Sequence, residues 1–142
     1  MRKPEDLKDF EGAWTLMRRI EDRQQGQVST LAGSATFAND GFGLTYREEG
    51  ALSVDGQPPL SASRTYLWRR GEGLSVKVLF EDGSAFHAIS LGRTMPEATH
   101  ICAPDLYYVT YDFNRWPSWS SDWRVRGPKK DYRMRSDYVR PR

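Results

Sequence analysis

The sequence has few of the residues that build redox, metal or disulfide sites. Its 142 residues include one cysteine, Cys102, and two histidines, His87 and His100. A single cysteine excludes an internal disulfide framework. No signal-like apolar segment follows Met1, and together these features predict a reducing, cytoplasmic setting.

Long apolar runs and a strong net charge are also missing. No run approaches the roughly 20 apolar residues that a membrane-spanning helix needs. The 21 basic and 19 acidic residues give a net charge of +2, so we expect neither a membrane nor a nucleic-acid partner. The basic excess is local and predicts at most a cationic patch, formed by Arg124, Arg126, Lys129, Lys130, Arg133, Arg135, Arg140 and Arg142.

Aromatic residues, in contrast, are abundant. They make up 13% of the chain and include five Trp and seven Tyr. These large rings suit pleated strand surfaces and cavity walls. A chain of this length is the size of one domain, and we therefore expect a single all-β domain over residues 1–142.

Alternating apolar residues and turn signals divide the chain into about ten strands. A short helix is predicted from Pro4 to Phe10, because proline suits the first helical turn and acidic residues follow it. The first strand begins after Gly12 and runs to about Asp22. The others are expected over residues 31–37, 42–54, 60–70, 74–80, 84–91, 98–102, 106–113, 118–127 and 130–139.

Tight turns between these strands predict an antiparallel up-and-down meander. Asn39-Asp40-Gly41 is a strong tight-turn signal, and Asp82-Gly83 is a two-residue turn signal. Strict alternation after the second turn predicts that Phe86 and His87 point to opposite faces. Closure into a barrel removes the exposed edges of such a meander, so we expect a closed β-barrel.

The start of the chain resembles the opening of lipocalin-type (calycin) barrels. The segment that carries this resemblance is the short helix followed by Gly12-x-Trp14. In those barrels the tryptophan plugs one end and an arginine from a late strand packs across it. The resemblance implies that Arg133 or Arg135 supplies this arginine.

The chain also resembles, over nearly its whole length, an uncharacterised family of bacterial and fungal proteins placed among lipocalin-like barrels. This family has no assigned activity, so the resemblance implies a fold and no reaction. The matching segments are Tyr46-Arg47-Glu48-Glu49-Gly50, Tyr66-Leu67-Trp68, Phe80-Glu81-Asp82-Gly83, Phe86-His87, Asp105-Leu106-Tyr107, Tyr111-Asp112-Phe113 and, most distinctive, Trp123-Arg124-Val125-Arg126-Gly127-Pro128-Lys129-Lys130-Asp131-Tyr132.

Many polar and aromatic residues fall where alternate positions of a barrel point inward. They predict a lined cavity that binds a small amphipathic or acidic molecule, in a protein that is a monomer or homodimer. Arg64 or Arg124 would pair with the anionic end, and the other predicted ligand-binding residues are Tyr46, Tyr66, Trp68, His87, Tyr107 and Tyr111. The alternative is a packed interior in which these residues are surface aromatics and satisfied hydrogen-bonding groups.

Two further functions remain open. In a small barrel enzyme of the isomerase, cyclase or hydrolase kind, His87 or His100 would be the acid-base group, beside a carboxylate such as Glu48 or Asp105. His100-x-Cys102 is an incomplete metal-ligand set, so we expect an inert thiol, no metal and no other cofactor.

An interaction module is the third possibility. Trp116-Pro117-Ser118-Trp119 would be its contact surface if these tryptophans were exposed.

Overall fold

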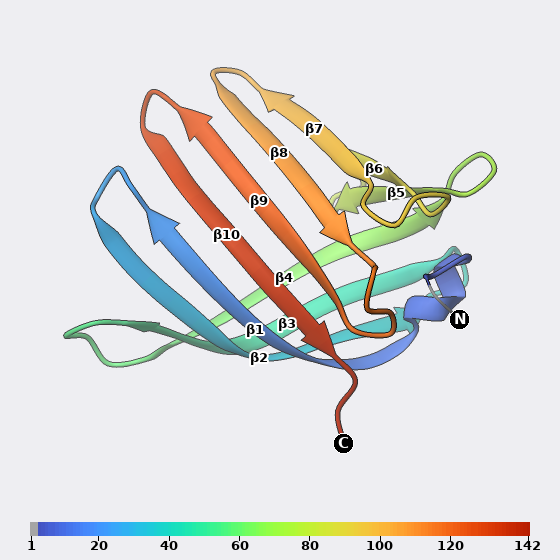
Figure 1. Cartoon of the computed structure of the whole chain (residues 1–142), viewed down its shortest axis with the longest axis horizontal. Coiled ribbons are helices and arrows are strands. Elements are labelled where there is room, and N and C mark those ends of the chain that lie inside the picture. The colour runs from blue at the N-terminus through green and yellow to red at the C-terminus, as the bar shows by residue number, and fades with distance from the viewer. Residues whose placement is uncertain (1–2) are drawn as a thin grey trace.

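The computed structural model describes residues 3–142 and contains ten antiparallel strands in one sheet. Each strand pairs with its sequence neighbour, and β1 also pairs with β10. This confirms the all-β, up-and-down architecture (Figure 1). The strands are β1 (Gly12–Asp22), β2 (Gln27–Asn39), β3 (Leu44–Val54), β4 (Leu60–Arg70), β5 (Ser75–Phe80), β6 (Ala85–Ser90), β7 (Glu97–Cys102), β8 (Asp105–Asp112), β9 (Trp119–Gly127) and β10 (Lys130–Val139).

The barrel is nearly closed. The strand order is β6-β5-β4-β3-β2-β1-β10-β9-β8-β7, so β6 and β7 are the two edge strands. They come next to each other in Figure 1, although within residues 3–142 no hydrogen-bonded ladder joins them. The curved sheet therefore wraps around one interior, which alternate residues of each strand face.

The N-terminal helix is shorter than predicted. Within residues 3–142 only η1 (Leu7–Phe10) is helical, as a single 3-10 turn that buries Leu7 and Phe10. The backbone N–H of Asp6 donates to the Asp9 carboxylate at 3.1 Å and fixes the start of this turn. Within the described residues no helix has the length and hydropathy of a membrane span.

An aromatic cluster behind η1 closes one end of the barrel. Phe10 contacts the rings of Trp68 and Trp119 at centroid distances of 5.2 and 5.5 Å. Trp14 is fully buried and donates its indole N–H to the carbonyl of Phe10 at 2.9 Å. Such ring contacts stabilise a core beyond their buried area, by about 0.5–1.5 kcal/mol per pair.

The arginine that packs across Trp14 is Arg140, directly after β10. Its guanidinium carbon lies 3.7 Å from the centroid of the Trp14 ring. The side chain also donates to the carbonyls of three residues around the turn into β1, one of them Ala13 at 3.1 Å. The prediction of Arg133 or Arg135 was wrong, because these side chains pair with Asp122 and Asp137 on the outer face.

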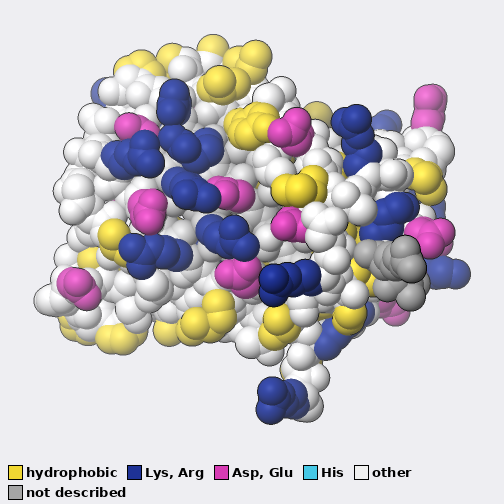
Figure 2. Space-filling view, in the orientation of Figure 1, with side chains coloured by type: hydrophobic (Ala, Val, Ile, Leu, Met, Phe, Trp, Pro, Cys, Tyr) yellow, Lys and Arg dark blue, Asp and Glu magenta, His cyan; other side chains and the backbone are white. Residues whose placement is uncertain are grey.

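Basic and acidic side chains alternate on the outer face of β1, β9 and β10. Figure 2 shows them interspersed, without a broad area of one sign. Arg133 forms a bidentate pair with Asp122, and Arg19 pairs with Glu21. The basic residues near the C-terminus therefore do not form a uniform cationic patch.

The two tryptophans that an interaction surface would require to be exposed, Trp116 and Trp119, are not exposed. Trp119 lies in the core with 4% of its surface exposed. Trp116 is half-buried and contacts the rings of Phe10 and Trp14 at 5.1 and 5.7 Å. The proposed contact surface at residues 116–119 was wrong, because these rings complete the closed end of the barrel.

A β-bulge changes which residues of β6 face inward. Val78 is opposite His87 and Leu79 is opposite Ala85, so Phe86 is an extra residue without a partner in the ladder. Both Phe86 and His87 line the interior. The prediction that they point to opposite faces was wrong, because a bulge interrupts strict alternation.

Candidate ligand-binding cavity

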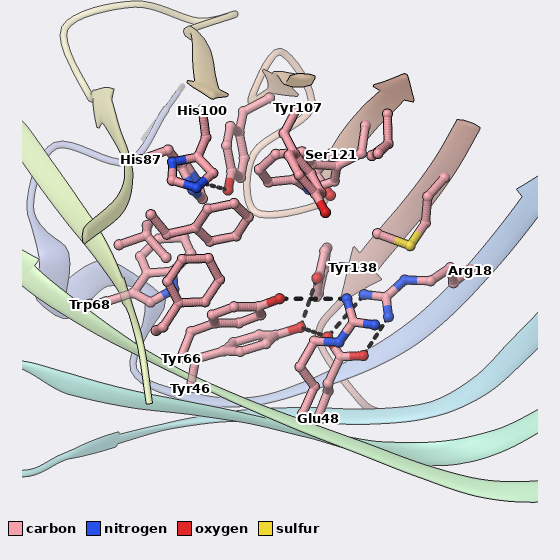
Figure 3. Close-up of a pocket in the computed structure, with 18 of the residues that line it drawn as sticks. Arg18, Tyr46, Glu48, Tyr66, Trp68, His87, His100, Tyr107, Ser121 and Tyr138 are labelled. Atoms are coloured by element: carbon pink, nitrogen blue, oxygen red, sulfur yellow. Dashed lines mark hydrogen bonds and ion pairs between the residues drawn. The ribbon is translucent and has the colours of Figure 1, made fainter. Parts of the chain in front are cut away.

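The barrel encloses a cavity of about 300 Å³ (Figure 3). Nine of the ten strands contribute to its wall, β2 being the exception. The lining residues are Arg18, Tyr46, Glu48, Arg64, Tyr66, Trp68, Val78, Phe80, Phe86, His87, His100, Cys102, Tyr107, Tyr111, Trp119, Ser121, Trp123, Val125, Tyr132, Met134 and Tyr138.

The cavity has a buried base and an accessible mouth. Trp119 forms part of the base and stacks on Tyr138 with a centroid distance of 3.8 Å and an interplanar angle of 6°. Both rings are almost fully buried. Towards the mouth the lining residues become half-buried, as at Tyr107, or exposed, as at Arg64 and Cys102. A ligand would therefore enter from the end opposite η1.

A buried ion pair lies in the wall between base and mouth. Arg18 on β1 binds Glu48 on β3 through both guanidinium NH2 groups, one of them at 2.9 Å from Oε1. Arg18 Nε donates to Ser136 Oγ at 2.7 Å, and the Tyr46 hydroxyl donates to Glu48 at 2.7 Å. The Tyr138 hydroxyl completes the network at 2.8 Å from that of Tyr46.

The charges of this pair cancel inside the barrel. Burial alone would raise the pKa of Glu48, but the hydrogen bond and charge of Arg18 lower it below its usual value. Burial alone would lower the pKa of Arg18, but the hydrogen bond to Glu48 outweighs burial and raises this pKa. Burial raises the pKa of Tyr46 and Tyr138, so both stay neutral phenols.

His87 is neutral and hydrogen-bonded to a tyrosine. Its Nε2 lies 2.8 Å from the hydroxyl of Tyr111 on β8. Burial, followed by the nearby charge of His100, lowers the pKa of His87 to about 3. Burial raises the pKa of Tyr111. At neutral pH the two side chains therefore exchange one hydrogen bond and carry no charge.

Two polar atoms of the cavity wall have no hydrogen-bond partner. Among residues 3–142, the buried side-chain nitrogen or oxygen atoms without one are Nδ1 of His87 and Nε1 of Trp119. Both residues also flank the Tyr111 ring, with centroid distances of 5.9 and 6.2 Å. An unpaired buried polar group costs about 1–3 kcal/mol.

Arg64 is the basic residue at the mouth. It lies opposite Glu48 in the ladder between β3 and β4, and its Nη1 is 3.5 Å from the Tyr66 hydroxyl. Over the described part of the chain, no ion pair links Arg64 to a carboxylate. Lys130, by contrast, lies 3.1 Å from Asp105.

The structure brings most of the predicted ligand-binding residues into one wall: Tyr46, Arg64, Tyr66, Trp68, His87, Tyr107 and Tyr111. Arg124 is not among the lining residues, since its strand neighbours Trp123 and Val125 face the cavity and it points to the other side. Whether the seven bind a ligand stays a prediction.

Sequence reasoning missed Arg18 and one of the two tyrosines of its network, Tyr138. Alternation along β1 places Arg18 on the same face as Trp14 and Leu16. A charged residue on a predicted inward face was therefore a usable signal. Alternation along β10 likewise places Tyr138 on the same inward face as Met134.

The structure also places the candidates for metal binding and catalysis. His100 and Cys102 both line the cavity near its mouth, but within residues 3–142 no three His, Cys, Asp or Glu side chains are arranged to hold a metal ion. The hydrogen-bond partner of His87 is Tyr111, where the enzyme hypothesis required a carboxylate.

Two solved structures have similar folds. A superposition on an S-type phycobiliprotein lyase from Guillardia theta gives a TM-score of 0.62 at 12% identity and covers 96% of this chain and 90% of that one. A protein of unknown function from the DUF3598 family of Nostoc punctiforme gives 0.53 at 11% identity, covering 94% of this chain and 47% of that one. At these identities the likeness is one of fold.

Sequence comparison gives the family. A comparison with curated proteins found no match. A family model matches residues 10–140, which is nearly the whole barrel, and the chain belongs to that family of unknown function, DUF6314.

Proposed function

We propose that the protein binds a small amphipathic molecule, with its aromatic or apolar body inside the barrel and an anionic end beside Arg64. The cavity itself carries this proposal. Its volume of about 300 Å³ is roughly ten times the 30 Å³ that one water occupies in the liquid. Close-packed protein interiors leave few voids larger than one water molecule, so the interior is not that of a packed core.

The chemistry of the wall indicates the body of the ligand. Aromatic rings from several strands face the space, among them Trp68, Phe86 and Trp123. Phe86 and Trp123 stack with a centroid distance of 5.1 Å and an interplanar angle of 10°. Flat aromatic surfaces favour planar or apolar groups of small molecules, while a few polar groups set the orientation.

The charge distribution indicates where an acidic group would bind. Arg18 is neutralised by Glu48, and His87 is neutral. Among the lining residues in the described part of the chain, Arg64 therefore remains as the arginine without its own carboxylate, and a ligand anion at the mouth would pair with it.

A binding protein fits the site better than the enzyme alternative. General acid-base catalysis works best with a group whose pKa lies near the working pH. The pKa of His87 is about 3, and its partner is the phenol of Tyr111, whose pKa is raised. Neither group of this pair is suited to exchange protons at neutral pH.

We also propose a structural group, a cellular location and an oligomeric state for the protein. The Arg140–Trp14 contact supports placing the barrel among the calycins. The exposed free thiol of Cys102 supports a reducing, cytoplasmic setting. We propose a monomer or homodimer, which size-exclusion chromatography with light scattering tests.

The binding test uses 2-naphthoate, a planar aromatic carboxylate, in isothermal titration calorimetry. We expect binding to the wild type and loss of binding in Ser121→Phe, which places a ring in the cavity from a lining position. Arg64→Gln should weaken binding about tenfold, as expected for a lost charge-assisted hydrogen bond. Arg126→Gln, on the exposed side of β9, is the matched control and should bind as the wild type does.

Two outcomes would contradict the proposal. One is equal binding of 2-naphthoate to the wild type and to a folded Ser121→Phe variant, because the probe would then lie elsewhere. The other is absence of binding to the wild type together with a native mass that equals the denatured mass in protein purified from cells. Thermal unfolding of each variant separates loss of binding from loss of fold.

A further inference from the structure

The tip of the β7–β8 hairpin exposes apolar side chains at the mouth end of the barrel. Ile101 on β7 is 74% exposed and lies opposite Leu106 on β8, which is 44% exposed. The turn between the two strands adds exposed Ala103 and Pro104. These four residues form the apolar tip of the hairpin. Exposed apolar residues that gather at one place, unlike scattered ones, indicate an interaction site.

Basic side chains without carboxylate partners lie beside the apolar tip. Arg126 on β9 is exposed and lies opposite Leu106 in the ladder between β8 and β9. Arg124 lies two residues before it on the same strand, and exposed Lys129 lies in the turn that follows. Within residues 3–142 none of these three basic residues forms an ion pair. Figure 2 shows apolar side chains at this end of the molecule with Lys and Arg side chains next to them.

The size and charge of this region fit a lipid surface better than a protein partner. Stable protein interfaces use roughly 20–30 residues on each side, whereas the apolar tip is a narrow hairpin end. A bilayer accommodates such a tip, because a few apolar side chains enter between the headgroups while neighbouring basic residues pair with anionic lipids. The three unpaired basic residues supply this charge complementarity.

We propose that the apolar tip docks on an anionic membrane surface, with Arg124, Arg126 and Lys129 against the lipid headgroups. The inference goes beyond the proposed function, because docking requires no ligand in the cavity. Cys102 and Tyr107 lie at the same strand ends and line the cavity, so docking brings the mouth next to the headgroups. The net charge of +2 did not predict a membrane partner, since a total over the chain does not show which basic residues lack a carboxylate.

The test is flotation of the whole protein with lipid vesicles. We expect binding to vesicles of phosphatidylcholine mixed with phosphatidylglycerol, little binding to phosphatidylcholine alone, and release at high salt, because salt screens the headgroup charge. Ile101→Ser should weaken partitioning about tenfold through loss of a large apolar side chain. Arg126→Gln should weaken it about fivefold through loss of one charge near the surface.

Phe42→Ser and Arg135→Gln are the matched controls. Phe42 is 82% exposed but lies between β2 and β3, at the closed end of the barrel. Arg135 is also exposed and already pairs with Asp137. Neither substitution should change vesicle binding.

Three results would overturn the inference. They are absence of binding to anionic vesicles, equal weakening by Ile101→Ser and Phe42→Ser, and a dimer in light scattering that Ile101→Ser dissociates, because the tip would then be a protein interface. Titration with 2-naphthoate in the absence of vesicles tests the proposed function separately. Ile101→Ser should bind this probe as the wild type does.

A fluorescent label gives a readout that does not depend on affinity. Cys102 is the only cysteine of the chain, so Cys102→Ser provides a background for a single label. An environment-sensitive dye attached through Ile101→Cys should shift its emission to shorter wavelength on anionic vesicles, and the same dye attached through Phe42→Cys should not. A shift at position 42 with none at position 101 would overturn the inference, because the opposite end of the barrel would then face the bilayer.

Discussion

Removing Arg18 should leave the buried carboxylate of Glu48 without its counter-charge and destabilise the fold. The two side chains are 6% and 5% exposed, so Arg18→Met leaves a carboxylate in the barrel interior without its cation. Breaking a buried pair from one side costs about 3–5 kcal/mol. We expect a loss of this size in the free energy of unfolding at pH 7, measured by urea denaturation. Arg133→Met removes a pair whose side chains are 41% and 28% exposed and should cost less than about 1 kcal/mol.

The pH dependence identifies the charge as the cause. In the wild type the pKa of folded Glu48 lies below its usual value of 4.5, so this residue contributes stability above about pH 4.5 that is lost as pH falls. In Arg18→Met the same burial without a guanidinium raises the folded pKa, so its contribution is present at low pH and is lost as pH rises. The stability difference between the two proteins should therefore shrink from pH 7 to pH 4.

A double variant completes the test. Arg18→Met with Glu48→Gln removes both charges, and we expect it to recover a large part of the stability lost in Arg18→Met. The reasoning would be refuted by a cost of Arg18→Met below about 1 kcal/mol at pH 7. A stability difference that stays constant between pH 4 and pH 7 would refute it as well.

Three other predictions follow from the site and the closed end. The pKa of folded His87 is about 3, against 6.5 for the free group, so its contribution to stability is present above pH 6.5 and is lost as pH falls. In urea unfolding, His87→Phe should therefore lose up to about 2 kcal/mol less stability than the wild type between pH 7 and pH 5. Equal losses in the two proteins would contradict this. Arg140→Ala should lower stability by about 1–2 kcal/mol through the lost Trp14 contact and backbone hydrogen bonds, with exposed Arg135→Ala as a near-neutral control in thermal unfolding. Cys102 is exposed and lines the mouth, so bound 2-naphthoate should slow its reaction with a thiol reagent; an unchanged rate would argue against a ligand at the mouth.

The strand pattern was predictable because each element has a local signal. Alternation along residues 60–70 and 130–139 gave the bounds of β4 and β10 that the structure has. The Asn39 side chain accepts from the backbone N–H of Gly41 at 2.8 Å, and Gly41 has a φ of 87°. Such turns depend on a few consecutive residues, so the local sequence predicts them.

The partners of the site were not predictable in the same way. Arg18 and Glu48 are 30 residues apart, and their side chains meet over β2, which lies between β1 and β3 in the sheet. Alternation predicts that both residues point inward. Which of several inward polar residues meet depends on strand tilt and stagger around the barrel, which no local pattern records.

The bulge in β6 shows how a local irregularity decides the chemistry of the cavity. With strict alternation, Phe86 and His87 would face opposite sides, and one of them would point to solvent. His87 is paired with inward-facing Val78 and reaches the Tyr111 hydroxyl. The bulge lets Phe86 face inward as well, where it stacks on Trp123. The bulge therefore adds the Phe86 ring to the cavity wall, while the inward direction of His87 follows from its pairing with inward-facing Val78. Deletion of Phe86 should restore alternation in β6 and remove the ring that stacks on Trp123, while His87 stays opposite Val78. It should therefore weaken the binding of 2-naphthoate in titration calorimetry in a barrel that remains folded.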